Sequence, residues 1–136
     1  MLSDGTSRSF SVISLNIRSL LCKLDELSSL LSLLGGRFDI ICIAETWLTS
    51  STKRLVEMVN YQFCGVERSE RRGGGVGVFV REHIKFKMIN NLSFIGEGIE
   101  SVFVECWVGN RRIIIGSLYR PPGNDPAVFF LSLIHI

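Results

Sequence analysis

Four side chains in this 136-residue sequence have the chemistry to bind a cation or a phosphate group: Asn16, Glu45, Tyr119 and Arg120. A glutamate supplies oxygen ligands to hard cations, and Mg²⁺ takes few such ligands from protein. The arginine fork fits a phosphate group, and the tyrosine hydroxyl can donate to an anionic oxygen. The asparagine can orient a phosphate or hold Glu45 by a hydrogen bond. Taken singly, each also has an ordinary explanation, as a solvated strand end, a turn residue or a packed aromatic ring.

The segment from Phe38 to Leu48 places Glu45 at the end of a predicted strand. Its apolar residues alternate between two faces, with Phe38, Ile40, Cys42 and Ala44 on one and Ile41 and Ile43 on the other. Because both faces are apolar, we expect a central strand that is covered on two sides. Ligands bind at the carboxyl ends of strands in α/β sheets, which is where Glu45 lies.

An earlier strand, Phe10 to Ile17, places Asn16 in a similar position. Between the two strands, leucines recur at spacings of three and four and predict a helix that ends at the two glycines 35 and 36: Leu20, Leu24, Leu27, Leu31 and Leu34. A strand, a helix and a strand imply a right-handed crossover between parallel neighbours. We therefore expect Asn16 and Glu45 at the same edge of the sheet.

The second half of the sequence predicts a short helix, then short antiparallel strands added to the parallel start as one mixed sheet. The helix is expected at 51–59 and the strands at 61–66, 76–80, 102–108 and 113–119, with 84–89 as a continuation of the second strand. Gly109-Asn110 is a two-residue hairpin signal of the glycine-first type, which pairs Val108 with Arg111 and Val104 with Ile115. Asp125 and Pro126 resemble the start of another helix.

The composition narrows the class of protein. It is 46% hydrophobic and 21% charged, which excludes a disordered tail, and a net charge of +2 does not by itself argue for nucleic acid. The four cysteines form no C-x-x-C pair, so we expect buried thiols in a reducing compartment. The N-terminus is polar and no apolar run approaches the roughly 20 residues that span a bilayer. The sequence therefore predicts a soluble intracellular protein without a membrane partner.

Two further features are predicted to be structural. The glycine-rich segment Gly73–Gly77 lacks the G-x-x-x-x-G-K pattern of a phosphate loop and precedes a strand, so we interpret it as a permissive turn. The two histidines, His83 and His135, give no recognisable pair of nucleophile and base. Hydrolysis by a serine or cysteine triad is therefore not expected.

Four segments together resemble the start of an endonuclease/exonuclease/phosphatase domain, the superfamily of apurinic endonucleases and pancreatic deoxyribonuclease. They occur in the family's order at 14–20 (SLNIRSL), 39–48 (DIICIAETWL), 73–76 (GGGV) and 117–122 (SLYRPP). The E-T-W-L and Y-R-P-P wording is most similar to the endonucleases of non-LTR retrotransposons of the jockey and chicken-repeat type. Each segment is weak alone, whereas four in order across nearly the whole chain are fairly specific.

This resemblance implies a four-layer α/β sandwich and Mg²⁺-dependent cleavage of phosphodiester bonds in DNA, with Mn²⁺ as an alternative cation. It assigns Glu45 to the metal, Asn16 to orienting the phosphate and the active-site acids, and Tyr119 to the scissile phosphate. Arg120 is a candidate phosphate contact from its own side-chain chemistry. In the retroelement relatives the nick supplies a primer end for reverse transcription. The resemblance also implies a nuclear location.

The sequence departs from the family in its later motifs, an aspartate–asparagine pair, a further aspartate and a terminal aspartate–histidine. Asp125 and His135 do not match these contexts. We therefore interpret residues 1–130 as the N-terminal part of one such domain, with only the first sheet and its helices, and residues 131–136 as an atypical tail. Such a piece should be inactive and should expose an apolar sheet face that favours association. A phosphatase or phosphodiesterase of the superfamily acting on a small phosphorylated substrate, or a non-enzymatic remnant, are the alternatives.

Overall fold

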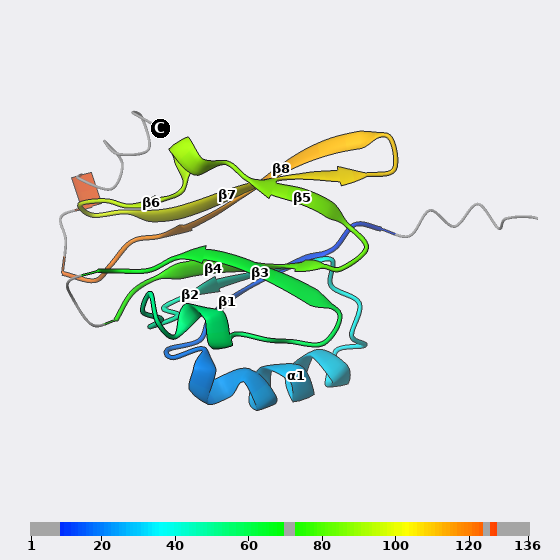
Figure 1. Cartoon of the computed structure of the whole chain (residues 1–136), viewed down its shortest axis with the longest axis horizontal. Coiled ribbons are helices and arrows are strands. Elements are labelled where there is room, and N and C mark those ends of the chain that lie inside the picture. Colours follow the sequence, from blue (N-terminus) through cyan, green and yellow to red (C-terminus); the bar gives the residue numbers. More distant parts are fainter. Residues whose placement is uncertain (1–8, 70–72, 124–125, 128–136) are drawn as a thin grey trace, which may run out of the picture.

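A computed structural model describes residues 9–69, 73–123 and 126–127. These residues form three layers (Figure 1): helix α1 (Leu24–Leu33), a first four-stranded sheet and a second four-stranded sheet. The first sheet therefore lies between the helix and the second sheet, and both of its faces are covered. None of the helices in the described residues has the length and apolar character that crossing a membrane requires.

The first sheet has the order β1 (Val12–Asn16), β2 (Ile40–Ala44), β4 (Val76–Arg81), β3 (Tyr61–Val66). Strands β1 and β2 are parallel, as the crossover predicted, and β4 is antiparallel to both β2 and β3. Strand β2 is central and its isoleucines have no exposed surface. The prediction of a central strand that ends at Glu45 is confirmed.

Helix α1 covers the outer face of this sheet. A short 3-10 helix, η1 (Leu21–Lys23), leads into it, and Leu20, Leu27 and Leu31 are buried in the cluster that includes residues of β2 and β4. Gly35 and Gly36 adopt left-handed φ angles, and the N–H of Gly36 donates to the Leu31 carbonyl at 2.6 Å. The helix therefore ends on a glycine cap, as predicted.

The second sheet consists of β5 (Lys85–Met88), β6 (Phe94–Ile95), β7 (Glu100–Val108) and β8 (Arg111–Tyr119), with a 3-10 helix η3 (Asn90–Leu92) before β6. Strand β7 pairs antiparallel with β5, β6 and β8. The hairpin register is the predicted one, since Val108 faces Arg111 and Val104 faces Ile115. Gly109 has a φ of 61°, as a glycine-first turn requires.

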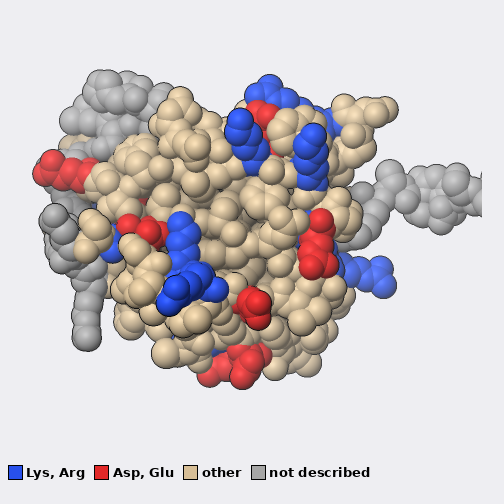
Figure 2. Space-filling model, viewed as in Figure 1, with Lys and Arg blue, Asp and Glu red and all other residues tan. Residues whose placement is uncertain are grey.

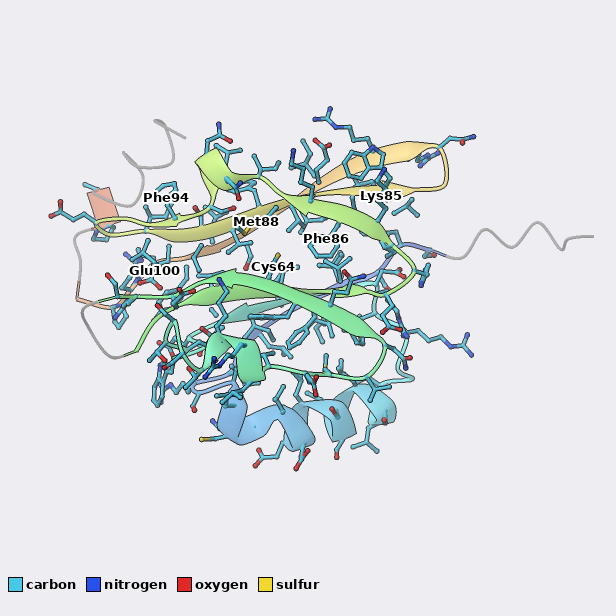
Figure 3. All side chains as sticks on the ribbon, in the orientation of Figure 1. Cys64, Lys85, Phe86, Met88, Phe94 and Glu100 are labelled. Carbon is cyan, nitrogen blue, oxygen red and sulfur yellow. The ribbon has the colours of Figure 1, made fainter. Side chains whose placement is uncertain are left out.

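The prediction that only the first sheet is present, joined by the later strands into one mixed sheet, is wrong. Strand β4 already pairs with β2 and β3, so it has no free edge for β5. The later strands form a second sheet whose inward residues cover the apolar face of the first, and Figure 3 shows Cys64 and Phe86 between the two sheets. The apolar face expected on the first sheet is therefore buried. Among the described residues the outer face of the second sheet carries no α-helix, and Ile114 and Leu118 are 50% and 40% exposed there.

The prediction of a helix at 51–59 is also wrong, because only the 3-10 turn η2 (Lys53–Leu55) forms there. The hydroxyls of Thr49 and Thr52 each accept a hydrogen bond from the backbone N–H of the other residue. Such local bonds compete with helix formation, and they leave Leu55 59% and Val59 83% exposed.

The remaining predictions concern the cysteines and the last residues. All four cysteines are free; Cys42 and Cys106 are buried, Cys64 is half-buried and Cys22 is exposed. The predictions for Asp125, His135 and the tail 131–136 lie outside the described residues.

Candidate functional site

The two sheets bring three of the predicted site residues to one end of the sandwich. In the β1–β2 register Asn16 lies beside Ala44, so Asn16 and Glu45 leave the first sheet at the same edge. Tyr119 ends β8 of the second sheet, and its hydroxyl donates a hydrogen bond to Glu45 Oε1. The contact between Glu45 and Tyr119 therefore joins the ends of two sheets, across 74 positions of sequence.

The loops after β1 and β2 have an unusual backbone. Of the five non-glycine residues with left-handed φ in the described part of the chain, four lie in these loops: Arg18, Ser19, Glu45 and Trp47. Side chains with a Cβ rarely adopt this conformation, and residues that do so cluster at functional sites where the surroundings hold them. Glu45 itself has a φ of 57°. The backbone therefore aims its carboxylate in a direction that regular strand geometry would not give.

Backbone hydrogen bonds hold the Glu45 loop on two sides. On one side, the N–H groups of Ser19 and Leu20 donate to the carbonyls of Glu45 and Thr46 at 3.0 and 2.9 Å. On the other side, the N–H groups of Thr46 and Trp47 donate to the carbonyls of Gly75 and Gly74 at 3.2 and 2.8 Å. The loop is thus clamped between the segment after β1 and the glycine segment before β4.

The two carboxylate oxygens of Glu45 differ in their surroundings. Oε1 accepts the Tyr119 hydroxyl, whereas Oε2 is buried and accepts no hydrogen bond. The Nε of Arg18 lies 3.4 Å from Oε2, and the Arg18 side chain is 73% exposed against 14% for Glu45. Oε2 therefore has an ion-pair partner but no hydrogen bond, and it keeps lone pairs that a hard cation could use. Arg18 supplies positive charge there from a largely exposed side chain.

Tyr119 remains a hydrogen-bond donor at neutral pH. Burial raises its pKa to about 12, helped by the hydrogen bond to Glu45 and the negative charges of Glu45 and Glu100. A neutral phenol fixes Glu45 Oε1 without adding charge. The predicted donation from Tyr119 to an anionic oxygen is therefore made within the protein, to Glu45.

The residues present fit a hard cation that is bound mainly by one carboxylate. Among the described residues no group of three or more histidine, cysteine, aspartate or glutamate side chains could hold a metal ion, which excludes a closed site of zinc type there. Mg²⁺ instead keeps several waters and binds through one or two carboxylates together with substrate phosphates. Glu45 Oε2 is the atom that could bind such an ion.

Asn16 and Arg120 lie at the rim without fixing Glu45. Both side chains are exposed, and neither makes a hydrogen bond within the described residues. The option that Asn16 holds Glu45 is therefore not realised, since Tyr119 and Arg18 contact that carboxylate instead. Both side chains remain available to a phosphate group.

Sequence reasoning missed Arg18, Arg68 and Glu100. Glu100 is 1% exposed, lies opposite Tyr119 in the β7–β8 register and accepts the Nε of Arg68 at 2.6 Å. The alternation of Val102, Val104 and Cys106 places Glu100 on the core-facing side of β7, and this was the available signal for an unusual acid. Arg18 lies two residues beyond Asn16, but its contact depends on the turn that follows β1.

Near the β7–β8 hairpin and beside Arg68, the basic side chains of the described residues lie among acidic ones. Figure 2 shows Lys and Arg atoms gathered near the β7–β8 hairpin, with acidic atoms among them. Arg112 pairs there with Glu105 at 2.6 Å, and the Lys85 ammonium lies over the Trp107 ring. A cavity of about 580 Å³ beside Arg68 and Glu100 is also lined by the acids Glu67 and Glu97, so it is not basic either.

Comparison with known proteins identifies the fold. No family model and no curated protein matches the chain. The endonuclease domain of TRAS1, a telomere-specific non-LTR retrotransposon, matches with a TM-score of 0.67 and 12% identity, over 93% of this chain and 52% of that chain. D. rerio TDP2 complexed with single strand DNA product gives 0.60 and 14%, over 93% and 54%. The AP endonuclease LMAP from Leishmania major gives 0.60 and 16%, over 93% and 44%.

These matches show a shared fold at low sequence identity. The chain spans about half the length of the structures it matches. Its two sheets and the α-helix α1 in the described residues correspond to part of the fold of these structures. The expected fold is confirmed to that extent, and three of its four expected layers are described.

Proposed function

We propose that this chain carries the cation-binding half of a Mg²⁺-dependent DNA endonuclease of the kind that non-LTR retrotransposons use to nick their target. The observation that supports the proposal best is the environment of the Glu45 carboxylate. Its carboxylate is oriented by Tyr119 through Oε1 and has a buried Oε2 without a hydrogen bond, at the strand ends where ligands bind in such folds.

Each residue of the site has a separate proposed role. Glu45 holds the cation, and Tyr119 keeps its carboxylate in one orientation. Asn16 and Arg120 face solvent at the same rim and can contact a phosphate group, with Arg120 offering two parallel donors. A bound Mg²⁺ supplies a Lewis acid that polarises a phosphoryl oxygen. Arg18 keeps positive charge near the carboxylate and also suits a phosphate oxygen.

Two observations favour DNA over a small phosphorylated substrate: the sequences of the motifs and the proteins that share the fold. The segments around Glu45 and Tyr119 resemble retrotransposon endonucleases, and the endonuclease domain of a retrotransposon is among the similar structures. The later motifs of that family, which include the groups that activate water, have no counterpart in the sequence. We therefore expect the 136-residue chain to bind Mg²⁺ and DNA together without nicking DNA by itself.

The proposal is tested by measuring how Mg²⁺ changes the affinity for a fluorescent duplex oligonucleotide by anisotropy. The variants are Glu45→Gln, which keeps the shape of the side chain, and Glu57→Gln, which removes the same charge from an exposed position. Mg²⁺ should strengthen DNA binding in the wild type and in Glu57→Gln, and should have no effect in Glu45→Gln.

Mg²⁺-dependent binding that survives Glu45→Gln would contradict the proposal. A Mg²⁺-dependent gain for thymidine monophosphate but none for duplex DNA would favour a small-substrate phosphatase. Nicking of supercoiled plasmid by the chain alone would contradict the expectation that further groups are needed.

A further inference from the structure

Glu100 uses both of its carboxylate oxygens inside the protein. Oε2 accepts the Arg68 Nε at 2.6 Å, and Oε1 accepts the backbone N–H of Gly75 at 2.7 Å. Glu100 lies between the two sheets, near one end of the sandwich (Figure 3). Glu100, the first residue of β7, therefore connects the second sheet to the glycine segment that leads into β4 of the first sheet.

Glu100 and Arg68 form an ion pair that is largely buried. The Glu100 side chain is 2% exposed and that of Arg68 is 17% exposed. Burying an ion pair costs desolvation, and apolar replacements of similar volume are often neutral or stabilising. Stability alone therefore gives a weak reason for an acid at this position. The geometry around it gives a stronger one.

The glycines are in close contact with the two groups that flank them. A Cβ on Gly74 would overlap the Arg68 guanidinium, and a Cβ on Gly75 would overlap Thr46 Oγ1. Arg68 therefore lies against the backbone of Gly74, while Gly75 lies against the residue that follows Glu45. Gly73, Gly74 and Gly75 have the positive φ angles of the permissive turn that the sequence predicted, and the segment is also a tightly packed spacer.

Hydrogen bonds continue from this spacer to the Glu45 loop. The carbonyls of Gly75 and Gly74 accept the N–H groups of Thr46 and Trp47, so the position of Gly75 sets the position of Thr46. Glu45 precedes Thr46 directly and has a left-handed φ that needs outside support. Glu100 is thus connected to Glu45 through two successive hydrogen bonds, by way of Gly75 and Thr46.

A second connection runs through the second sheet. Glu100 and Tyr119 are direct partners in the β7–β8 register, and the Tyr119 hydroxyl donates to Glu45 Oε1. Glu100 therefore contacts both parts of the structure that hold the Glu45 carboxylate. One is the glycine segment that binds the Glu45 loop, and the other is the strand that carries Tyr119.

We propose that Glu100 is a positioning residue that, together with Arg68, fixes the Glu45 loop through the N–H of Gly75 and thereby sets cation affinity. The effect on cation affinity depends on the proposed function, whereas the effect on the loop does not. A displaced supporting group around a metal ligand typically costs 10- to 100-fold in metal affinity. The acceptor at position 100 is the decisive atom, since it holds Gly75 in place.

Two double variants isolate that acceptor. Glu100→Gln/Arg68→Met retains a carbonyl oxygen that can accept the Gly75 N–H, whereas Glu100→Met/Arg68→Met has a side chain of similar size and no such acceptor. Both remove the charges of Glu100 and Arg68 together, so neither leaves one member of this pair buried without the other. They therefore differ mainly in one hydrogen bond. Glu105→Gln removes an acid from the exterior of the same strand and serves as the control.

Amide hydrogen exchange by NMR gives the readout that does not need a cation. We expect the amides of Thr46 and Trp47 to exchange about five- to tenfold faster in the methionine variant than in the glutamine variant, the factor for losing one hydrogen bond. The amides of Val104 and Ile115, which pair in the centre of the hairpin, should not change. General loss of structure would accelerate all four.

Mn²⁺ binding gives the second readout. We expect about tenfold weaker binding in the methionine variant and affinity near that of wild type in the glutamine variant and in Glu105→Gln. Equal exchange and equal affinity in the two double variants would overturn the inference. Wild-type protein that binds no Mn²⁺ would overturn the proposed function, and the exchange rates would still decide whether Glu100 positions the loop.

Discussion

Replacing Gly75 with alanine tests the packing that holds the candidate site. Gly75 has a φ of 89°, and a Cβ there would overlap Thr46 Oγ1. Gly35 at the end of α1 offers a matched control, because its φ is 94° and a Cβ there meets no atom within 4 Å. Alanine is strained by the left-handed backbone at either position, but only alanine at position 75 must also displace Thr46.

The expected magnitudes follow from these two costs. A left-handed conformation costs a residue with a Cβ about 1–2 kcal/mol, and forcing extra atoms into a packed region costs about 1–3 kcal/mol more. Gly35→Ala should therefore lower the free energy of unfolding by about 1–2 kcal/mol, and Gly75→Ala by about 2–5 kcal/mol. The entropy that alanine removes from the unfolded chain is similar at both positions and cancels in the comparison.

Urea unfolding followed by far-UV circular dichroism measures this difference. With a urea dependence of about 1–3 kcal/mol per M, the unfolding midpoint of Gly75→Ala should lie on the order of 1 M below that of Gly35→Ala. Equal midpoints for the two variants would refute the reasoning. They would mean that the contact between Gly75 and Thr46 is loose, and the connection from Glu100 to Glu45 would lose its central link.

Three further predictions follow from the same geometry. Tyr119→Phe removes the donor to Glu45 Oε1, so Mn²⁺ affinity should fall by about tenfold with little change in the midpoint of urea unfolding; unchanged affinity would show that the phenol does not orient Glu45. A thiol reagent at pH 8 should label Cys22 alone until the protein is unfolded, because burial raises the pKa of Cys64 to about 12 and that of Cys106 to about 11; rapid labelling of several thiols would contradict the burial of the cores. These raised values also predict that the free energy of unfolding falls as pH rises from about 9 towards 12, because the unfolded thiols lose their protons first; urea unfolding at pH 8 and pH 10 measures the loss, and a gain in stability at the higher pH would contradict it.

Local patterns in the sequence predicted the elements well where the pattern itself determines the structure. The alternation around Ile41 identified a central strand, and the Gly109-Asn110 turn set the register of β7 and β8 to the residue. The number of sheets could not be obtained in this way. An alternating strand shows which residues face a core, but it does not show whether that strand extends the first sheet or packs across from it.

The same distinction applies to the candidate site. The parallel crossover placed Asn16 and Glu45 at one edge because that relation follows from the order of the elements. The contact between Tyr119 and Glu45 required the two sheets to meet, and it was not predicted; the resemblance assigned Tyr119 to the scissile phosphate. Glu100 was overlooked because a strand-initial acid is ordinarily solvated, and its burial depends on Arg68 and Gly75, which arrive from a different loop.

The measurement that tests the central claim most directly is the dissociation constant for Mn²⁺ of wild-type protein and of Glu45→Gln. Electron paramagnetic resonance of free Mn²⁺ gives both values, and Glu57→Gln controls for the loss of one negative charge at the surface. If Glu45 Oε2 is the cation ligand, Glu45→Gln should weaken binding by at least about tenfold, while Glu57→Gln binds as wild type does. The same affinity in wild type and Glu45→Gln would contradict the assignment of the site.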